Sequence, residues 1–218
     1  MTIAPRRPRL TPAQVDLLRG RSRRQTGLSG VLMWEGGPSD HLLLIERGLV
    51  KITSSSRDGA PTLLALRGAD ELVGDFGCID NAPRSGTVVA VGPVTAWKLS
   101  AERFQRLLHT DIDLCNMALS LTVARVRESD QRLGAFREIT GPGRVIRLLA
   151  DLAASLAVGA DDLCAHVPVT HEELGAGAGV SRASVTRALR GLAGVGIIRQ
   201  RRGSIDVTDL PALVKRAE

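Results

Sequence analysis

Short apolar runs alternate with clusters of Gly, Pro, Asp and Ser between residues 28 and 99. This is the pattern of strands joined by tight turns. The apolar runs 42–45 and 49–52 flank Gly48, and this spacing predicts a hairpin with the glycine at its turn. Because no helical period occurs here, we expect an all-β region folded as a small barrel or sandwich.

Two further turns are predicted in the same region. The Arg-Asp-Gly sequence at 57–59 separates the apolar segments 51–54 and 62–66. Gly92-Pro93 divides residues 87–99 in the same way. Each pair of segments is therefore expected to form two antiparallel strands around a glycine turn.

Helical spacing replaces this pattern after Ser100, which is the expected N-cap of a short helix running through Leu108. From Asp111 onward, residues of one face fall at alternating steps of three and four, the spacing of a heptad seam. The seam consists of Ile112, Cys115, Leu119, Thr122, Val126, Ser129, Leu133 and Phe136. One amphipathic helix packed on its own β-region would also explain such a face. The strict alternation favours a dimer seam, in which the polar members need hydrogen-bond partners if buried.

Cap and breaker residues place the remaining helices. Thr11 followed by Pro12 predicts a helix start near the N-terminus. Gly141-Pro142-Gly143 is expected to break the long helix and to act as a hinge or domain boundary. An apolar helix is expected over residues 144–158, and a polar loop or short strand over 161–168.

Two helices joined by a tight glycine turn are predicted near the C-terminus. Thr170 and Glu173 form a capping box, so a short helix begins there and ends at the glycine turn 177–179. Ser181 is the expected N-cap of the second helix. That helix has Val185, Leu189 and Leu192 on one face and Arg182, Ala183, Thr186, Arg187 and Arg190 on the other. The arrangement is typical of a helix-turn-helix.

A basic hairpin is predicted directly after these helices. Its strands cover residues 197–200 and 204–207, and Arg201-Arg202-Gly203 forms the turn between them. A hairpin in this position completes a winged helix-turn-helix.

Charge is distributed unevenly along the chain. The 218 residues contain 29 Lys and Arg against 23 Asp and Glu, a formal net charge of +6. Residues 1–24 contain seven Arg and one acidic residue, and residues 176–203 contain six Arg and no acid. A solvated face normally mixes both signs, so the acid-free run favours contact with DNA. The basic segment 1–24 has no assigned role.

The scarcity of aromatic residues sharpens this interpretation. Three Phe, two Trp and no Tyr disfavour modules that stack bases on aromatic platforms, whereas arginines suit the grooves of duplex DNA. Within the second helix, the residues expected to face DNA are Ser181, Arg182, Ser184, Thr186 and Arg187, with Arg182 best placed to reach guanine edges. The residues expected to bind phosphates are Thr170, His171, Arg201 and Arg202.

Other function classes find little support. Cys78, Cys115 and Cys164 stand alone, so zinc, iron–sulfur and disulfide frameworks are not indicated and a reducing cytoplasm fits. No apolar stretch approaches the length of about 20 residues that spans a bilayer, and we expect no signal peptide. No catalytic constellation stands out, so an enzyme is not expected.

One glycine-rich segment, residues 73–87, contains chemistry suited to a phosphate. Backbone N–H groups and the Ser85 hydroxyl could donate to phosphate oxygens, and Arg84 could add a charge-assisted pair. Taken alone, the Pro-Arg-Ser-Gly sequence at 83–86 is more often an ordinary turn.

With these features together, nearly the whole chain resembles the CRP/FNR family, the cyclic-AMP receptor protein and its relatives. The resemblance implies an α+β fold: an N-terminal cyclic-nucleotide-binding-like β-roll, a long dimerisation helix and a C-terminal winged helix-turn-helix. The expected boundaries are 1–27 for a basic arm and helix, 28–110 for the β-roll, 111–140 for the dimerisation helix and 141–218 for the DNA-binding domain.

In that family, the segment matching residues 74–87 is the phosphate-binding cassette. The effector-binding residues that the resemblance implies are Gly74, Asp75, Arg84, Ser85, Ser129 and Asp130. Asp75 falls where cyclic-AMP binders have the Glu that takes the ribose 2′-hydroxyl, and Asp130 replaces a hydroxyl residue near the base. A carboxylate beside the base favours a donor-rich edge such as that of guanine, so cyclic AMP and cyclic GMP are both candidate effectors.

The second helix of the C-terminal module also matches the family. Its sequence from Ser181 to Arg187 resembles the family's Ser-Arg-Glu-Thr-Val-x-Arg. Ala183 replaces the Glu that reads a base, which implies a different operator sequence.

Three hypotheses follow. The first is a homodimeric transcription regulator of the bacterial cytoplasm, bound to a pseudo-palindromic operator at the nucleoid. Its β-roll senses a cyclic nucleotide, and binding repositions the recognition helices. RNA polymerase is a further expected partner. The second is a regulator that binds DNA without a ligand and has a degenerate pocket. The third, a cyclic-nucleotide-binding subunit acting on a protein partner, is disfavoured by the acid-free run at 176–203.

Overall fold

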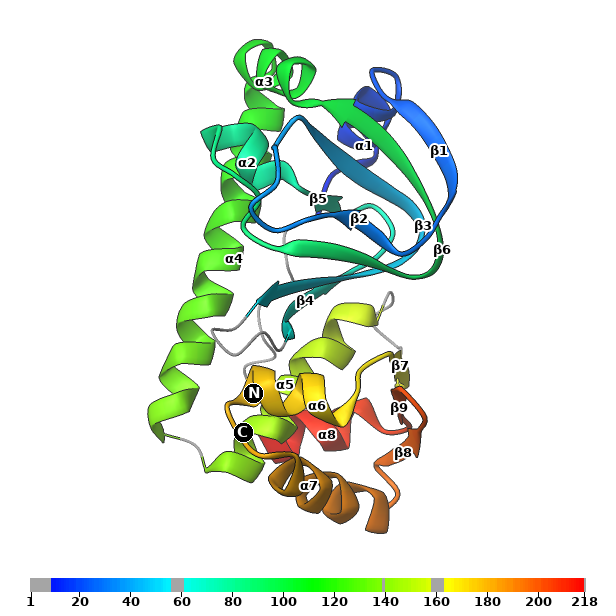
Figure 1. Cartoon of the computed structure of the whole chain (residues 1–218), viewed down its shortest axis with the longest axis vertical. Helices are drawn as coiled ribbons and strands as arrows, with labels where there is room; N and C mark the ends of the chain where they lie inside the picture. Colours follow the sequence, from blue (N-terminus) through cyan, green and yellow to red (C-terminus); the bar gives the residue numbers. More distant parts are fainter. Residues whose placement is uncertain (1–8, 56–60, 139, 158–162, 218) are drawn as a thin grey trace. The chain divides into compact units, whose positions relative to one another are not determined.

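The computed structural model of the chain describes residues 9–55, 61–138, 140–157 and 163–217. Of these, residues 9–55 and 65–129 form one compact unit, and residues 61–64 and 130–217 belong to a second. The α+β fold class is confirmed, with a β-sheet unit, intervening helices and a C-terminal helix-turn-helix (Figure 1). None of the helices in the described part of the chain has the length and hydropathy that crossing a membrane requires.

The first unit is built on a six-stranded sheet with the order β1-β6-β3-β4, in which β2 pairs with β6 and β5 pairs with β3. The strands are β1 (Arg23–Leu28), β2 (Val31–Met33), β3 (His41–Ser55), β4 (Pro61–Arg67), β5 (Leu72–Val73) and β6 (Thr87–Ser100). The sheet curls around an aliphatic interior formed by Met33, Leu43, Ile45, Val50, Val73, Val88, Val94 and Ala96. These residues bury apolar area, which is the main favourable term in folding.

The predicted hairpin turns at Gly48 and Gly92 are wrong. β3 and β6 are long strands that pair antiparallel from His41 opposite Ser100 to Thr53 opposite Thr87. The register shifts on both sides of position 47, and Gly48 and Gly92 have positive φ values of 95° and 77°. A glycine in this conformation suits a β-bulge as well as a turn, so each strand bends without reversing. The third predicted turn, at 57–59, lies outside the described residues.

Helices cover one side of this sheet and build a second core. They are α1 (Pro12–Arg19), α2 (Asp75–Asp80), α3 (Ala101–Thr110) and the first part of α4 (Ile112–Glu138). Their buried residues include Leu18, Cys78, Phe104 and Leu114, which pack with Leu42, Leu44 and Leu99 of the strands. The predicted caps are confirmed, because the Thr11 and Ser100 hydroxyls accept from the backbone N–H of Gln14 and Arg103.

α4 ends at Glu138 and α5 (Gly141–Leu156) follows as a separate helix of the second unit, so the long helix ends close to the predicted break but before Gly141. Residues 141–143 form the first turn of α5, and Thr140 is its N-cap. Proline lacks an N–H and has a fixed φ, so it is well tolerated in the first turn of a helix. The helix therefore begins three residues before the predicted start and ends at Leu156.

The C-terminal elements follow the predicted order. They are β7 (Ala165–Val167), α6 (His171–Ala178), α7 (Arg182–Gly194), β8 (Ile198–Arg201), β9 (Ser204–Val207) and α8 (Leu210–Ala217), with the strands in the order β7-β9-β8. Leu174, Val185, Leu189 and Leu192 are buried where α6 and α7 face the core. Gly179 ends α6 with a φ of +59°, which confirms the predicted glycine turn.

Gly48→Ala should destabilise the first unit much more than Gly92→Ala. A Cβ at position 48 would lie 2.8 Å from the Pro93 carbonyl oxygen, whereas a Cβ at position 92 would meet nothing within 4 Å. We expect a loss in unfolding free energy of about 3 kcal/mol for Gly48→Ala and about 1 kcal/mol for the control Gly92→Ala. Urea unfolding followed by the fluorescence of Trp34 and Trp97, both in this unit, measures the difference; equal losses would contradict it.

Candidate functional site

The glycine-rich cassette folds as a short helix followed by a loop. Gly74 precedes α2 with a φ of +79°, and Asn81 ends the helix with a φ of +58°. A Cβ at position 74 would lie 2.5 Å from Nη1 of Arg84 and 2.7 Å from Sδ of Met33. The backbone at this position therefore has room for the Arg84 guanidinium only because residue 74 is glycine.

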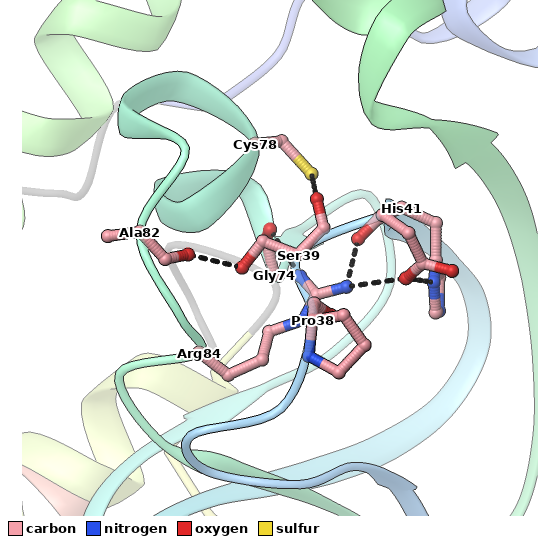
Figure 2. Close-up of polar contacts among 8 residues, drawn as sticks. Pro38, Ser39, His41, Gly74, Cys78, Ala82 and Arg84 are labelled. Carbon is pink, nitrogen blue, oxygen red and sulfur yellow. Dashed lines mark hydrogen bonds and ion pairs between the residues drawn. The ribbon is translucent and has the colours of Figure 1, made fainter.

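Arg84 is buried, with 6% of its surface exposed, and its guanidinium faces the protein (Figure 2). Nη1 donates to the carbonyl oxygen of Gly74 at 2.7 Å, Nη2 to that of His41 at 2.5 Å and Nε to that of Pro38 at 3.1 Å. Asp40 adds an ion pair with Nη2 at 3.5 Å. Most of the five N–H groups of the guanidinium thus have partners within the chain.

The loop between β2 and β3 is fastened to the cassette by further bonds. The Ser39 hydroxyl donates to the carbonyl oxygen of Ala82 at 2.7 Å, and the Cys78 thiol donates to that of Ser39 at 3.6 Å (Figure 2). Burial raises the pKa of the Cys78 thiol, which keeps it protonated and able to donate. The Gly36 N–H donates to the carbonyl oxygen of Arg84, and the Arg84 N–H donates to that of Gly37, so loop and cassette are joined by hydrogen bonds of both backbone and side chains.

Asp75, the carboxylate expected to meet a ribose, pairs with Arg125 of α4. Nη1 of Arg125 lies 2.9 and 2.8 Å from the two oxygens of Asp75, and Nη2 donates to the carbonyl oxygen of Leu72 at 3.0 Å. The guanidinium also lies 4.8 Å from the centre of the Phe76 ring. Sequence reasoning missed Arg125, although it lies one helical turn before Ser129 and so shares its face of α4.

The remaining predicted effector-binding residues are placed differently. Ser85, Ser129 and Asp130 are exposed, and the hydroxyls of Ser85 and Ser129 form no hydrogen bond with a described residue. The structure therefore brings Gly74 and Arg84 together and places Asp75 directly after Gly74 in α2, but it does not tie the two hydroxyls to them.

The predicted seam of α4 is largely uncovered in the single chain. Ile112, Leu119 and Val126 are 70%, 62% and 53% exposed, and Cys115 is partly buried. Thr122 satisfies its hydroxyl by donating to the carbonyl oxygen of Ala118 at 2.9 Å, so this polar member needs no outside partner. The side chains of Leu133 and Phe136 lie outside the described residues.

The second helix of the helix-turn-helix, α7, presents arginines to solvent. Arg182 and Arg187 are exposed, and neither forms an ion pair with a described residue. Ser181 caps the helix by accepting from the Ser184 N–H at 3.3 Å, and the two hydroxyls lie 3.2 Å apart. Thr186 donates to the carbonyl oxygen of Arg182 at 3.0 Å, so its hydroxyl is held within the helix.

The two residues predicted to bind phosphates at α6 serve local structure. The Thr170 hydroxyl accepts from the Glu173 N–H at 3.1 Å, which completes the predicted capping box. His171 lies 3.0 Å from Gln200 of β8 through Nε2 and 3.5 Å from the Thr186 hydroxyl through Nδ1. The histidine therefore connects α6, α7 and the β8–β9 hairpin.

The hairpin places its two predicted phosphate ligands differently. Arg201 is the last residue of β8, and its Nε pairs with the carboxylate of Asp206 in β9. Arg202 lies in the turn between the strands and is exposed. Hydrogen bonds from His166 and Arg201 hold the pKa of Asp206 below its usual range.

Two family models match separate parts of this chain. The family model of the cyclic nucleotide-binding domain matches residues 29–111, and the model of the Crp-like helix-turn-helix domain matches residues 143–216. The CRP-like cAMP-activated global transcriptional regulator of Mycobacterium tuberculosis is 28% identical over 185 residues, which cover 84% of this chain and 82% of the relative.

Two further relatives extend the likeness. The Cyclic AMP receptor protein of Thermus thermophilus is 29% identical over 205 residues, which cover 94% of this chain and 92% of the relative. The solved structure of FixK2 from Bradyrhizobium japonicum superposes with a TM-score of 0.73 at 16% identity, covering 89% of this chain and 96% of that chain. At that identity the likeness concerns the fold alone.

Removing one partner of the Asp75–Arg125 pair should destabilise the first unit by about 3 kcal/mol, because the other charge stays buried without a partner. The side chains of Arg125 and Asp75 are 17% and 6% exposed. A double-mutant cycle of Asp75→Asn and Arg125→Gln, measured by urea unfolding, should give a coupling of about 2 kcal/mol.

The matched control is the exposed pair of Glu102 and Arg106, at 3.5 Å, whose side chains are 79% and 65% exposed. The same cycle there should give less than about 0.5 kcal/mol. Additive losses at Asp75 and Arg125 would show that the buried pair contributes no specific stabilisation.

Proposed function

Since this chain belongs to the CRP/FNR family, whose members are transcription regulators and not enzymes, we propose that it acts as a homodimer on a pseudo-palindromic operator in duplex DNA. The observation that carries the proposal is the surface of α7. This helix of 13 residues contains three arginines and no acid, and its apolar face is buried against its own unit. An exposed helix face of one charge sign, on the second helix of a helix-turn-helix, suits the major groove.

The proposed dimer rests on the exposed apolar face of α4. Two copies of the helix, packed side by side, would bury Ile112, Leu119 and Val126, and the sequence continues this seam to Leu133 and Phe136. A two-fold dimer suits the proposed operator, because recognition helices of such proteins enter major grooves about 34 Å apart.

The proposed base readout centres on Arg182. It lies at the start of α7, where a side chain reaches deepest into the groove, and a guanidinium can donate two bonds to guanine O6 and N7. Arg187 lies further along the same helix and is the second candidate. Arg202, together with the N-termini of α6 and α7, would contact phosphates.

For the effector we propose a cyclic nucleotide in the cassette, with cyclic AMP and cyclic GMP as candidates. Its phosphate would meet Arg84 and Ser85, and its ribose would meet Asp75. Both charged groups already have partners, so the phosphate must replace carbonyl oxygens at Arg84 and the ribose must compete with Arg125. Binding that releases Arg125 would free a contact of α4, which gives the ligand a means to favour one helix arrangement over another.

The residues between 135 and 143 are the proposed hinge through which a change in α4 reaches the DNA-binding module. The proposed boundaries of the four segments stay those of the sequence analysis. Such a regulator acts where bacterial DNA lies, in the cytoplasm, and RNA polymerase is the proposed partner wherever it activates transcription.

A second candidate function is a regulator that binds DNA without an effector. The observation that favours it is that Arg84 and Asp75 both have hydrogen-bond or ion-pair partners within the protein. In that case the two charges would serve only to hold the loop, the cassette and α4 together.

Arg182→Ala should weaken operator discrimination. Duplexes selected from a random pool by the full chain supply the operator, and competition against unselected duplexes measures discrimination. Losing a bidentate guanine contact should cost about tenfold or more in that ratio. The matched control, Arg190→Ala, removes an exposed arginine further along α7 and should leave the ratio within about twofold. If Arg182→Ala discriminates as wild type does, the proposed register of α7 is wrong.

Calorimetric titration with cyclic AMP, cyclic GMP and cyclic di-GMP should detect binding of one ligand, and Ser85→Ala should weaken it about tenfold. Ser85 is exposed and holds no structural bond, so this variant keeps the fold. No heat with any ligand, together with selective DNA binding, would establish the second candidate instead. Binding of a ligand with no selective DNA binding would overturn the proposal in favour of a regulatory subunit.

A further inference from the structure

The carboxylate of Asp206 in the C-terminal sheet lies beside basic residues of the two neighbouring strands. Across the three strands of this sheet, Asp206 is opposite His166 of β7 on one side and Arg199 of β8 on the other. Arg201 lies two residues beyond Arg199 and so projects from the same face. Every residue of β7, β8 and β9 is described, and Asp206 is the only acid in these strands.

Both oxygens of Asp206 are occupied. Oδ1 lies 2.6 Å from Nδ1 of His166, and Oδ2 pairs with Nε of Arg201. The carboxylate is 21% exposed, whereas the Arg201 side chain is 65% exposed. A carboxylate held from two sides by neighbouring strands keeps its place more firmly than one in a surface pair between long side chains.

Arg202 has a different setting one residue further on. It lies in the turn, is exposed and forms no ion pair with a described residue. Of these two adjacent arginines, Asp206 therefore pairs with the first and not with the second.

We propose that Asp206 is a positioning residue that withholds Arg201 from the DNA backbone and leaves Arg202 as the phosphate contact of this hairpin. The inference rests on the proposed DNA-binding function. An arginine that neutralises a phosphate releases a condensed counterion, whereas an arginine already paired with a carboxylate releases little. The Asp206 charge also repels phosphate, which lowers the affinity for every duplex sequence.

The salt dependence of binding to random-sequence duplex separates the two arginines. Each phosphate contact contributes about 0.9 to the slope of log K against log salt. Arg202→Gln should reduce the slope by about 0.9 for each hairpin on the DNA, while Arg201→Gln, the matched control on the neighbouring residue, should leave it unchanged. In the Asp206→Asn variant the magnitude of the slope should increase by about 0.9 for each hairpin on the DNA. Adding Arg201→Gln to that variant should remove the increase.

Two results would overturn the inference. One is an equal reduction of the slope's magnitude by Arg201→Gln and by Arg202→Gln, each made in the otherwise wild-type chain. This comparison does not depend on any change at Asp206. The other is a slope unchanged by Asp206→Asn in a variant whose circular dichroism matches wild type. If the chain binds duplex DNA but behaves in either of these ways, only this inference is wrong. If the chain binds no duplex DNA at all, the proposed function and the inference are both wrong.

Discussion

The cassette depends on how one buried guanidinium is satisfied. Arginine does not lose its proton in proteins, so a buried arginine must find acceptors or destabilise the fold. Arg84 finds them in the carbonyl oxygens of Pro38, Gly74 and His41. Those three acceptors come from two separate stretches of chain, and the arginine fixes the distance between them. Glycine at position 74 and the closely attached loop 36–41 follow from this one requirement.

The same requirement governs what a ligand can do at the cassette. An anion that approaches Arg84 meets donors already directed at carbonyl oxygens, and a hydroxyl that approaches Asp75 meets a carboxylate already paired with Arg125. Binding must therefore exchange partners instead of filling vacant ones. Such an exchange lowers the affinity that a preformed site would have, but it also links binding to a structural change. Because Arg125 belongs to α4, the exchanged contact lies on the helix that also has the exposed apolar face.

Local chemistry made much of the fold predictable from the sequence. Thr11, Ser100, Thr170 and Ser181 were placed correctly as caps, because a cap depends on residues only three positions apart. Gly48 was misplaced for an equally physical reason. Positive φ serves a turn or a bulge, and only the opposite strand decides between them. At the site, the residue types were visible in the sequence, but their partners were not. Arg84 bonds to a carbonyl 46 residues away, and Arg125 pairs with a carboxylate 50 residues away.

The arginines of this chain fall into two groups that differ in the cost of meeting an outside partner. Arg84, Arg125 and Arg201 have acceptors within the chain, and an external anion competes with these acceptors for the same N–H groups. Arg182, Arg187 and Arg202 are exposed and form no ion pair with a described residue, so a phosphate or a guanine replaces only water at these positions. Contact with DNA through the second group therefore requires no rearrangement of the ion pairs within the folded chain. Contact with an effector through the first group does require one. On the proposed function, an effector would therefore act by changing how two such exposed arginine surfaces are held and not by creating them.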